Sequence, residues 1–287
     1  MLLSILVVSR SHKLLSQMLL SISKSTSLDK NNVEILCSWN GNDIDESKIE
    51  NRSGYNFKIP EREKYHFATN INSLAKLATG KILLIINDDI ILDTNSIDYA
   101  INQLLENSKV GIVTGKLRYQ NGMLQHAGIT FDCKNIPYHK FEKSIKSNSS
   151  LISKEDQVIP AASGALIFIK KDVFLEIGFN ESYEICGEDI ELSLDLREKK
   201  DYIILFSPQV SGIHLSSATR KKVNQYGNSV NDMSRMRKRR EDFINNVSKN
   251  QILDELNDLT NQVDIFKKIG ITRKNLKTFL KRLIKKN

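Results

Sequence analysis

Six short apolar runs recur along the first 206 residues and predict buried β-strands. They lie at residues 4–8, 33–37, 82–86, 110–114, 165–169 and 202–206. Several are continuous rather than alternating, which is typical of strands that are buried on both faces of a sheet. The first run is too short to span a membrane, and no basic flank or small-residue cleavage site accompanies it. We therefore interpret it as a strand and not as a signal peptide.

Helical patterns separate these runs. Apolar residues at helical spacing occupy residues 14–22, 71–78 and 97–105. Gly80 is expected to cap the second helix at its C-terminus, and Asp93, Thr94 or Asn95 to cap the third at its N-terminus. Because strands alternate with helices, the sequence predicts an α/β fold whose sheet is mainly parallel at its start.

The rhythm of strands and helices changes at two places. Residues 116–160 are mostly polar and are expected to form an insertion over one end of the sheet, where an acceptor or a lid would belong. After about residue 222 no strand pattern remains, and the chain is polar, charged and helix-prone. We predict an α/β domain over residues 1–222 and a basic helical C-terminal extension over residues 223–287.

The net charge of +8 lies largely in this extension. Residues 235–240 are mostly basic, which most often marks a solvated helix face and otherwise contact with anionic lipid or a lipid-diphosphate acceptor. Residues 265–287 include a basic amphipathic helix, predicted to lie on an anionic membrane or to pack on protein, a second subunit of a homo-oligomer included. Nucleic acid is a poor candidate partner, since no recognition motif is present. Three widely spaced cysteines favour a reducing cytoplasm.

The strongest chemical signal is the Asn87-Asp88-Asp89 motif at the end of the third apolar run. Carboxylates at the end of a buried strand are costly unless they are compensated, and a divalent metal is the usual compensation. Ligands of open α/β sheets bind at the carboxyl ends of the strands. The motif therefore predicts a cation site at that edge of the sheet.

Two later segments carry further candidate residues. Glu188 and Asp189 precede a helical stretch, so they are expected in a first helical turn, where the helix dipole favours their ionised forms. Such a carboxylate serves as a general base if it faces a cleft, and otherwise simply caps the helix. His214 follows the last apolar run and is either structural or a ligand for manganese or magnesium together with Asp89 and a phosphate.

Taken in order, these motifs resemble the family 2 glycosyltransferases, which have the nucleotide-sugar-binding fold called GT-A. The resemblance covers roughly residues 3–220. It rests on the following ordered pieces: Ser9-Arg10, the segment 38–43, Asn72 with residues 78–80, the motif 87–89, the turn 122–128, residues 163–165, Gly178-Phe179, the segment 188–192 and His214.

The resemblance implies a metal-dependent reaction that inverts the anomeric carbon of a nucleotide-linked sugar. It implies manganese or magnesium on Asp89 and His214, with Asp189 as the base for the acceptor hydroxyl and Glu188 holding a sugar. The residues implied on the donor side are Ser9, Arg10, Trp39, Asn40, Asp43, Asn72, Asn87 and Asp88. Gly164, Glu191 and His126 are implied on the acceptor side, although a histidine in a polar turn is more often solvated or structural.

Two residues depart from the pattern of the family. Asn87 replaces the first acid of the metal motif, and Trp39 stands where many relatives have an acid that reads the base. Trp39 either stacks on the base or belongs to the core, so UDP- and dTDP-linked donors both remain open. The resemblance implies a glycan or lipid-linked acceptor and a role in bacterial surface polysaccharide assembly on the cytoplasmic side of the membrane. The alternative is a nucleotide-sugar-binding assembly protein of the same fold with little or no catalysis.

Overall fold

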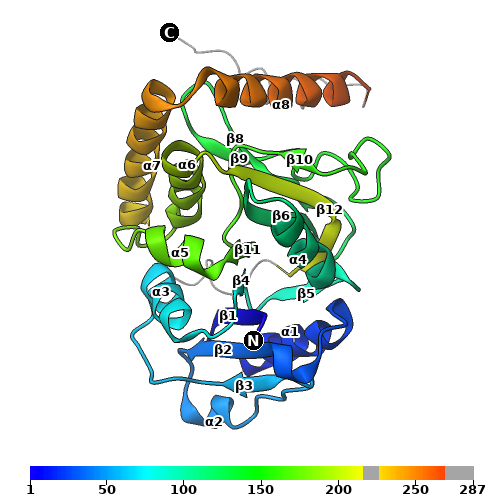
Figure 1. Ribbon diagram of the computed structural model, residues 1–287, viewed down its shortest axis with the longest axis vertical. Helices are drawn as coiled ribbons and strands as arrows, with labels where there is room; N and C mark the ends of the chain where they lie inside the picture. The colour runs from blue at the N-terminus through cyan, green and yellow to red at the C-terminus, as the bar shows by residue number, and fades with distance from the viewer. Residues whose placement is uncertain (216–225, 269–287) are drawn as a thin grey trace.

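A computed structural model describes residues 1–215 and 226–268 as a mixed sheet flanked by helices (Figure 1). The strands are β1 (Leu3–Ser9), β2 (Val33–Trp39), β3 (Asn56–Lys58), β4 (Ile82–Ile86), β5 (Ile90–Leu92), β6 (Val110–Arg118), β7 (Leu124–His126), β8 (Ile129–Phe131), β9 (Pro137–His139), β10 (Gln157–Val158), β11 (Leu166–Lys170) and β12 (Ile203–His214). The helices are α1 (His12–Ser25), α2 (Asp43–Glu46), α3 (Phe67–Leu77), α4 (Ser96–Glu106), α5 (Lys171–Ile177), α6 (Glu188–Lys200), α7 (Tyr226–Asn246) and α8 (Lys249–Lys268).

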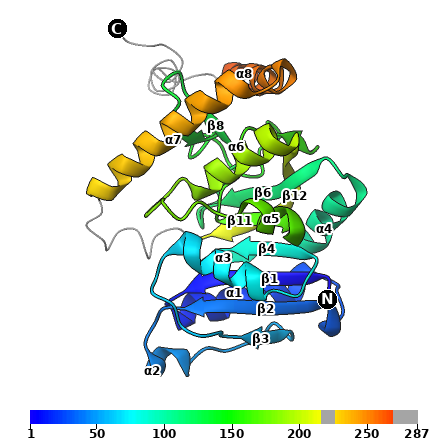
Figure 2. The same cartoon turned by 60° about the vertical axis from the view of Figure 1, so that its left-hand side comes forward.

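The sheet has the order β10-β12-β6-β11-β4-β1-β2-β3. Its N-terminal part is parallel, as the alternation of strands and helices predicts: β1 pairs in parallel with β2 and with β4, and β2 with β3. Figure 2 shows these strands side by side. β1, β2 and β4 run in the same direction, so their C-terminal ends lie at the same side of the sheet. Ser9, Trp39 and Asn87 are therefore found together at that side.

Two antiparallel pairings bring distant segments to that side of the sheet. β11 runs antiparallel to β4, so residues just before β11 lie beside the end of β4, and the Asn87 N–H donates to the Ala165 carbonyl at 3.0 Å. β12 runs antiparallel to β5 with His214 opposite Ile90. This second pairing carries His214 to the acidic motif across more than a hundred residues of sequence.

Helices cover both faces of the sheet. The apolar sides of α1 and α4 pack on one face with Leu15, Met18, Ile97 and Leu104 fully buried. α3, α5 and α6 pack on the other face. Burial on both sides explains why the central strands are continuously apolar, since all seven residues of β1 and all five of β4 are buried.

Two details of the predicted elements are wrong. Gly80 does not cap α3, which ends at Leu77 with Ala78 as its C-cap. Gly80 instead packs on β1, where an added Cβ would lie 2.5 Å from the Ser4 nitrogen. Residues 116–160 are also not a simple insertion, because β6 continues to Arg118 and both β7 and β10 join the main sheet. Only the β8–β9 hairpin forms a separate sheet.

The helices after residue 225 pack on the body of the molecule. Both views show α7 alongside α6 and α8 across one end (Figures 1 and 2). Met236 and Phe243 of α7 are buried in one apolar cluster with Ile129, Tyr183 and Ile190. Phe266 of α8 is buried in the cluster on the α3 side of the sheet. α7 and α8 therefore share a core with the α/β part, and the boundary predicted at residue 222 stays a prediction that a truncation would test.

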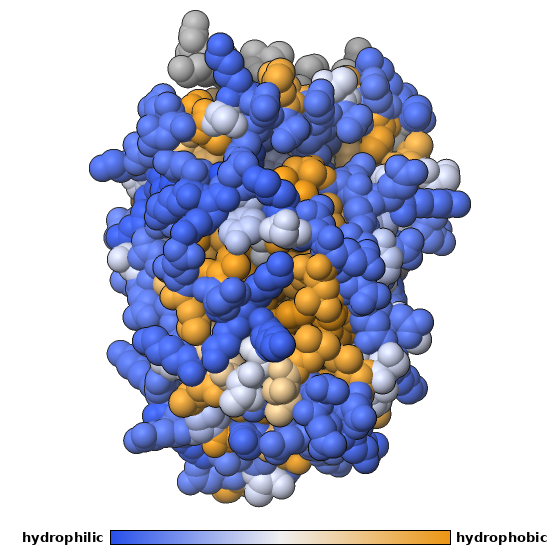
Figure 3. Space-filling model, in the orientation of Figure 1, coloured by the Kyte–Doolittle hydropathy of each residue, from blue (hydrophilic) through white to orange (hydrophobic). Residues whose placement is uncertain are grey.

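The prediction of a solvated face for residues 235–240 is wrong for two of the arginines. Arg239 makes ion pairs with Asp195 and Glu198 of α6, both at 2.6 Å. Arg240 is 5% exposed and lies over the Phe131 ring. None of the described helices is long and apolar enough to cross a bilayer. On the face in Figure 3 hydrophilic side chains predominate, and hydrophobic ones gather toward its middle. The basic helix predicted near the C-terminus lies outside the described residues.

Candidate active site

A cavity of about 690 Å³ opens where β1 and β4 end. Its wall is formed by the ends of β1 and β4, the start of α3, the segment before β11, the loop and first turn of α6, the β6–β9 region with the end of β12, and one side of α7. Of the predicted site residues, the cavity is lined by Ser9, Arg10, Asn87, Asp88, Asp89, His126, Gly164, Glu188, Asp189 and His214. The fold thus brings together ten side chains or glycines from six separate parts of the sequence.

Asp88 faces the end of β1. Its carboxylate accepts a hydrogen bond from the Ser9 hydroxyl at 2.5 Å. The pKa of Asp88 is raised to about 6, chiefly by burial and also by the nearby charge of Asp89, against the opposing effect of the Ser9 hydrogen bond. The Asp88 carboxylate is therefore held against Ser9, on the side of the cavity predicted for the donor.

Asp89 and His214 are in direct contact, with Asp89 Oδ1 3.0 Å from His214 Nε2. The other ring nitrogen, Nδ1, lies 2.8 Å from Gln125 Oε1. When Nδ1 donates to that oxygen in a neutral ring, Nε2 is an acceptor. Two acceptors at this distance repel each other unless a proton or a metal cation lies between or beside them.

The chemistry of this pair suits a divalent metal, because carboxylate and imidazole are ligands of manganese or magnesium. Gln125 would supply the outer contact that orients the ring of a metal-bound histidine. No group of three or more His, Cys, Asp or Glu side chains capable of holding a metal occurs in the described part of the chain. Further ligands would have to come from the nucleotide or from Asn87.

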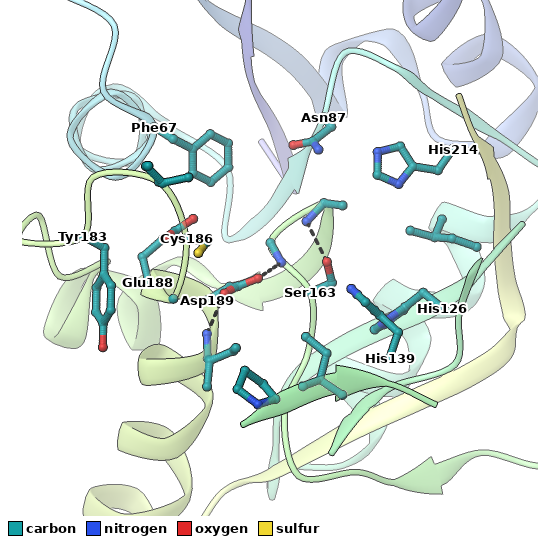
Figure 4. Close-up of a pocket in the computed structure, with 18 of the residues that line it drawn as sticks. Phe67, Asn87, His126, His139, Ser163, Tyr183, Cys186, Glu188, Asp189 and His214 are labelled. Carbon is teal, nitrogen blue, oxygen red and sulfur yellow. Dashed lines mark hydrogen bonds between the residues drawn. The ribbon is translucent and has the colours of Figure 1, made fainter. Parts of the chain in front are cut away.

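Asp189 lies at the opposite side of the cavity, in the first turn of α6 (Figure 4). Its Oδ2 accepts a hydrogen bond from the Gly164 N–H at 2.6 Å, and its Oδ1 accepts from its neighbour's N–H, that of Ile190, at 2.8 Å. Gly164 has little room for a side chain, because an added Cβ would lie 3.2 Å from the Asp189 Cβ. Backbone groups of two elements therefore hold this carboxylate at the cavity wall.

Five predicted site residues do not line the cavity: Trp39, Asn40, Asp43, Asn72 and Glu191. Trp39 is 1% exposed within the core around β2, so the structure corrects the stacking interpretation in favour of the core alternative. Asp43 is exposed on α2 and pairs with Arg62 at 2.6 Å. Trp39 at the end of β2 and Asp43 at the start of α2 both lie outside the cavity wall.

Asn72 and Glu191 have local structural partners. The Asn72 amide donates to the Phe179 carbonyl and accepts from the Phe179 N–H, both at 2.9 Å, which ties α3 to the 178–181 turn. Glu191 accepts from the Tyr183 hydroxyl at 2.6 Å and from the Asn180 amide at 2.8 Å. Asn40 donates from its amide nitrogen to the Glu63 carbonyl at 2.7 Å. These contacts shape the loops around the cavity.

His126 is buried, contrary to the solvated alternative, and its Nδ1 lies 2.8 Å from that of His139. Burial lowers the pKa of His126 well below its ordinary value, and His139 adds to this effect. The His126 Nε2 atom is buried without a hydrogen-bond partner. The sequence did not single out His139, because a histidine on a short hairpin has no distinguishing pattern.

Other cavity residues were also missed by sequence reasoning. They include Gln125, Tyr183, Cys186, Met233 and Met236. Gln125 directly precedes a predicted residue and was within reach of sequence reasoning. The two methionines were not, because they lie on α7, beyond the boundary at residue 222.

The sheet has an acidic motif after β4, and across the cavity this motif faces a helix that begins with two acids, Glu188 and Asp189. This arrangement is that of the GT-A class of α/β folds. The chain belongs to glycosyltransferase family 2, since the model described as "Glycosyltransferase like family 2" matches residues 5–241. The match extends past residue 222 into α7, and it confirms the family that the sequence motifs indicate.

Curated relatives match part of the chain. The O-antigen biosynthesis protein RfbC of Myxococcus xanthus is 28% identical over 169 residues, which are 57% of this chain and 13% of that protein. A poly-beta-1,6-N-acetyl-D-glucosamine synthase of Staphylococcus epidermidis is 26% identical over 192 residues, which are 66% of this chain and 44% of the synthase. The chain therefore spans less than half the length of either relative.

Solved structures confirm the fold. GalNAc-T7, solved with UDP, GalNAc and Mn2+, matches with a TM-score of 0.58 and 15% identity over 76% of this chain and 44% of that one. The mannosyltransferase PcManGT of Pyrobaculum calidifontis, solved with GDP-Man and Mn2+, matches with a TM-score of 0.54 and 15% identity over 76% and 57% of the two chains. At this level of identity the likeness concerns the fold alone.

Proposed function

We propose that this chain transfers a sugar, with inversion, from a nucleotide-diphosphate sugar to a glycan or lipid-linked acceptor. The observation that carries the proposal is the two-sided cavity, with the Asp89–His214 pair on one side and Asp189 on the other. Figure 4 shows His214 and Asp189 on these two sides. The family membership and the names of the relatives support a role in surface-polysaccharide synthesis. The proposed donors are UDP- or dTDP-linked sugars.

On the donor side, Asp89 and His214 would hold manganese or magnesium against the diphosphate. The ion supplies charge stabilisation for the leaving nucleotide. Ser9 and Asp88 form a hydrogen-bonded pair at the end of β1, and Asp88 would contact the ribose or the donor sugar from there. Asn87 is a neutral and weaker ligand than an acid, so we expect the metal to bind mainly together with the nucleotide.

On the acceptor side, Asp189 would remove the proton from the attacking hydroxyl. The hydrogen bonds from the Gly164 and Ile190 N–H groups fix the orientation of the carboxylate, and the N-terminal end of α6 stabilises its negative charge. Attack from this side, opposite the diphosphate, inverts the anomeric carbon. Glu188, which also lines the cavity, would hold the acceptor or donor sugar.

Replacing Asp189 with Asn tests the proposed base. Thermal-shift screening of nucleotide sugars with manganese first identifies the donor, and a bacterial glycan panel supplies acceptors. We expect Asp189→Asn to lower kcat by about 10³-fold while the affinity for UDP or dTDP with manganese is unchanged. Chelation with EDTA should abolish transfer, and manganese or magnesium should restore it.

Asp172→Asn is the matched control, because Asp172 is also an acid in a first helical turn but is exposed on α5, outside the cavity wall. Near-normal turnover of Asp189→Asn would contradict the assignment of the base. The alternative, a binding protein without catalysis, is motivated by Asn87 and predicts donor binding with neither hydrolysis nor transfer on any acceptor of the panel.

A further inference from the structure

The loop that leads into α6 is held by a single carboxylate of α7. Asp232 is 1% exposed, and its oxygens accept hydrogen bonds from three consecutive backbone N–H groups. The donors are Glu184 at 3.3 Å, Ile185 at 2.8 Å and Cys186 at 3.2 Å. Hydrogen bonds to an ionised carboxylate are stronger than neutral ones, so three of them constrain this loop tightly.

Neighbouring residues of α7 hold the same loop. Arg235 donates to the Ser182 carbonyl, and its guanidinium lies 5.3 Å from the centre of the Tyr183 ring. Met236 packs against Gly187, where an added Cβ would lie 2.7 Å from the Met236 Cγ. Positions 232, 235 and 236 share one face of a helix because residues three and four apart are neighbours. One face of α7 thus contacts the loop from Ser182 to Gly187.

The loop is part of the cavity wall and ends at the proposed base. Residues 183–187 line the cavity together with Met233 and Met236. Gly187, with φ of 121°, is the N-cap of α6 and directly precedes Glu188 and Asp189. Figure 4 shows Tyr183, Cys186 and Glu188 on the same side of the cavity as Asp189. Any shift of the loop therefore displaces the acceptor side of the site.

We propose that Asp232 is a positioning residue for transfer: it fixes residues 184–186 so that the acceptor hydroxyl and Asp189 meet in reactive geometry. The proposal rests on the function proposed above. Because the donor side is built from β1, β4 and β12, Asp232 acts on the acceptor step and leaves the donor contacts unchanged. Misplacement of a reacting group by about 1 Å can reduce a rate about 10²-fold.

The full-length chain with Asp232→Ala or Asp232→Asn tests the proposal, with Asp242→Asn as the control. Asp242 is an exposed carboxylate on the same helix. Hydrogen exchange of the peptide containing residues 183–187 measures directly how firmly Asp232 holds the backbone N–H groups of residues 184–186. This measurement does not depend on enzyme activity. We expect exchange at least tenfold faster in Asp232→Ala, an intermediate rate in Asp232→Asn, which keeps one acceptor oxygen, and the wild-type rate in Asp242→Asn.

Kinetics then separate positioning from a general loss of stability. We expect kcat to fall at least tenfold in Asp232→Ala, with a smaller fall in Asp232→Asn, while the Kd for UDP or dTDP with manganese stays within twofold of the wild-type value. Unchanged exchange, unchanged kcat, or a rise in that Kd matching the loss of activity would each overturn the proposal. If the wild-type protein transfers no sugar, the proposed function fails, while the exchange result still decides whether Asp232 holds the loop.

Discussion

At the scale of single residues, the proposed base Asp189 fits closely against Gly164. The Gly164 N–H donates to the Asp189 carboxylate at 2.6 Å, and an added methyl group would lie 3.3 Å from the accepting oxygen. We expect Gly164→Ala to lower kcat about tenfold through a few tenths of an ångström of displacement at Asp189. Steady-state kinetics measure the effect, and the thermal midpoint should change by less than about 4 °C.

A double variant shows whether the Gly164 effect passes through Asp189. Residues that act as a unit are strongly non-additive. In an Asp189→Asn background, Gly164→Ala should therefore have almost no further effect on kcat. An equal tenfold loss in both backgrounds would show that Gly164 acts on another part of the site.

At the scale of elements, Glu34 connects β2 to β1 and to the turn after α3. The carboxylate is 2% exposed, and its Oε1 accepts hydrogen bonds from the Ser4 hydroxyl and from the Thr79 N–H and hydroxyl, each at 2.7 Å. Burial acts to raise the pKa of Glu34, but these hydrogen bonds outweigh it and leave the pKa below its ordinary value. Ionised Glu34 therefore stabilises the folded state.

This lowered pKa gives a pH-dependent prediction. The contribution of ionised Glu34 to the free energy of unfolding is fully present above the ordinary glutamate pKa of about 4.3. It is lost as the pH falls through the lower pKa of Glu34 in the folded state. We expect Glu34→Gln to reduce the free energy of unfolding by about 1–3 kcal/mol at pH 7, and the difference from wild type to shrink below about pH 4. Urea unfolding across pH measures this, with the exposed Glu106→Gln as control. A difference that is constant with pH would contradict the prediction.

The packing of α8 depends on a buried carboxylate between two arginines. Glu255 Oε1 lies 2.6 Å from Arg197 of α6 and 3.0 Å from Arg240 of α7. Neutralising it leaves two buried guanidinium groups without their shared counter-charge. We expect Glu255→Gln to destabilise the fold by about 3 kcal/mol, measured by denaturant unfolding. Glu241→Gln, at an exposed position of α7, should stay within about 0.5 kcal/mol of wild type, and an equally small change in Glu255→Gln would show that α8 does not depend on this pair.

At the scale of the whole molecule, the distribution of charge separates the body from the C-terminal segment. Two arginines of α7, Arg239 and Arg240, are used in internal ion pairs, so they leave less charge for an anionic partner. The basic amphipathic pattern beyond residue 268 remains the best candidate for membrane contact. Each basic residue near an anionic surface contributes about 1 kcal/mol.

Flotation with liposomes tests this membrane contact. We expect the full chain to float with anionic vesicles and to be released at high salt, and a chain truncated after Lys268 to remain at the bottom of the gradient. Neither should float with neutral phosphatidylcholine vesicles. Equal flotation of the two chains on anionic vesicles would remove the segment 269–287 as an anchor.

The sequence by itself determined the six central strands (β1, β2, β4, β6, β11 and β12), the helices α1, α3, α4 and α6, and the order of the motifs, but not the short strands β3, β5 and β7–β10. Local patterns suffice for these features, because a buried strand must be continuously apolar and an amphipathic helix must repeat its apolar residues every three to four positions. The acidic motif after β4 and the acids at the start of α6 were therefore predictable, as was the family. The predicted ends of the third helix, residues 97–105, lie within one residue of the ends of α4, and Asn95 is its N-cap.

Only the tertiary structure decided which of these residues share a cavity. Antiparallel pairing of β12 with β5 brings His214 to Asp89, and the packing of α7 on α6 brings Asp232 to residues 184–186. Trp39 lies in the core because it packs within the apolar cluster around β1, β2 and α1. No local sequence pattern predicts this packing. Contacts between residues far apart in sequence depend on strand order and helix packing, and those follow from the burial of the whole chain rather than from any one segment.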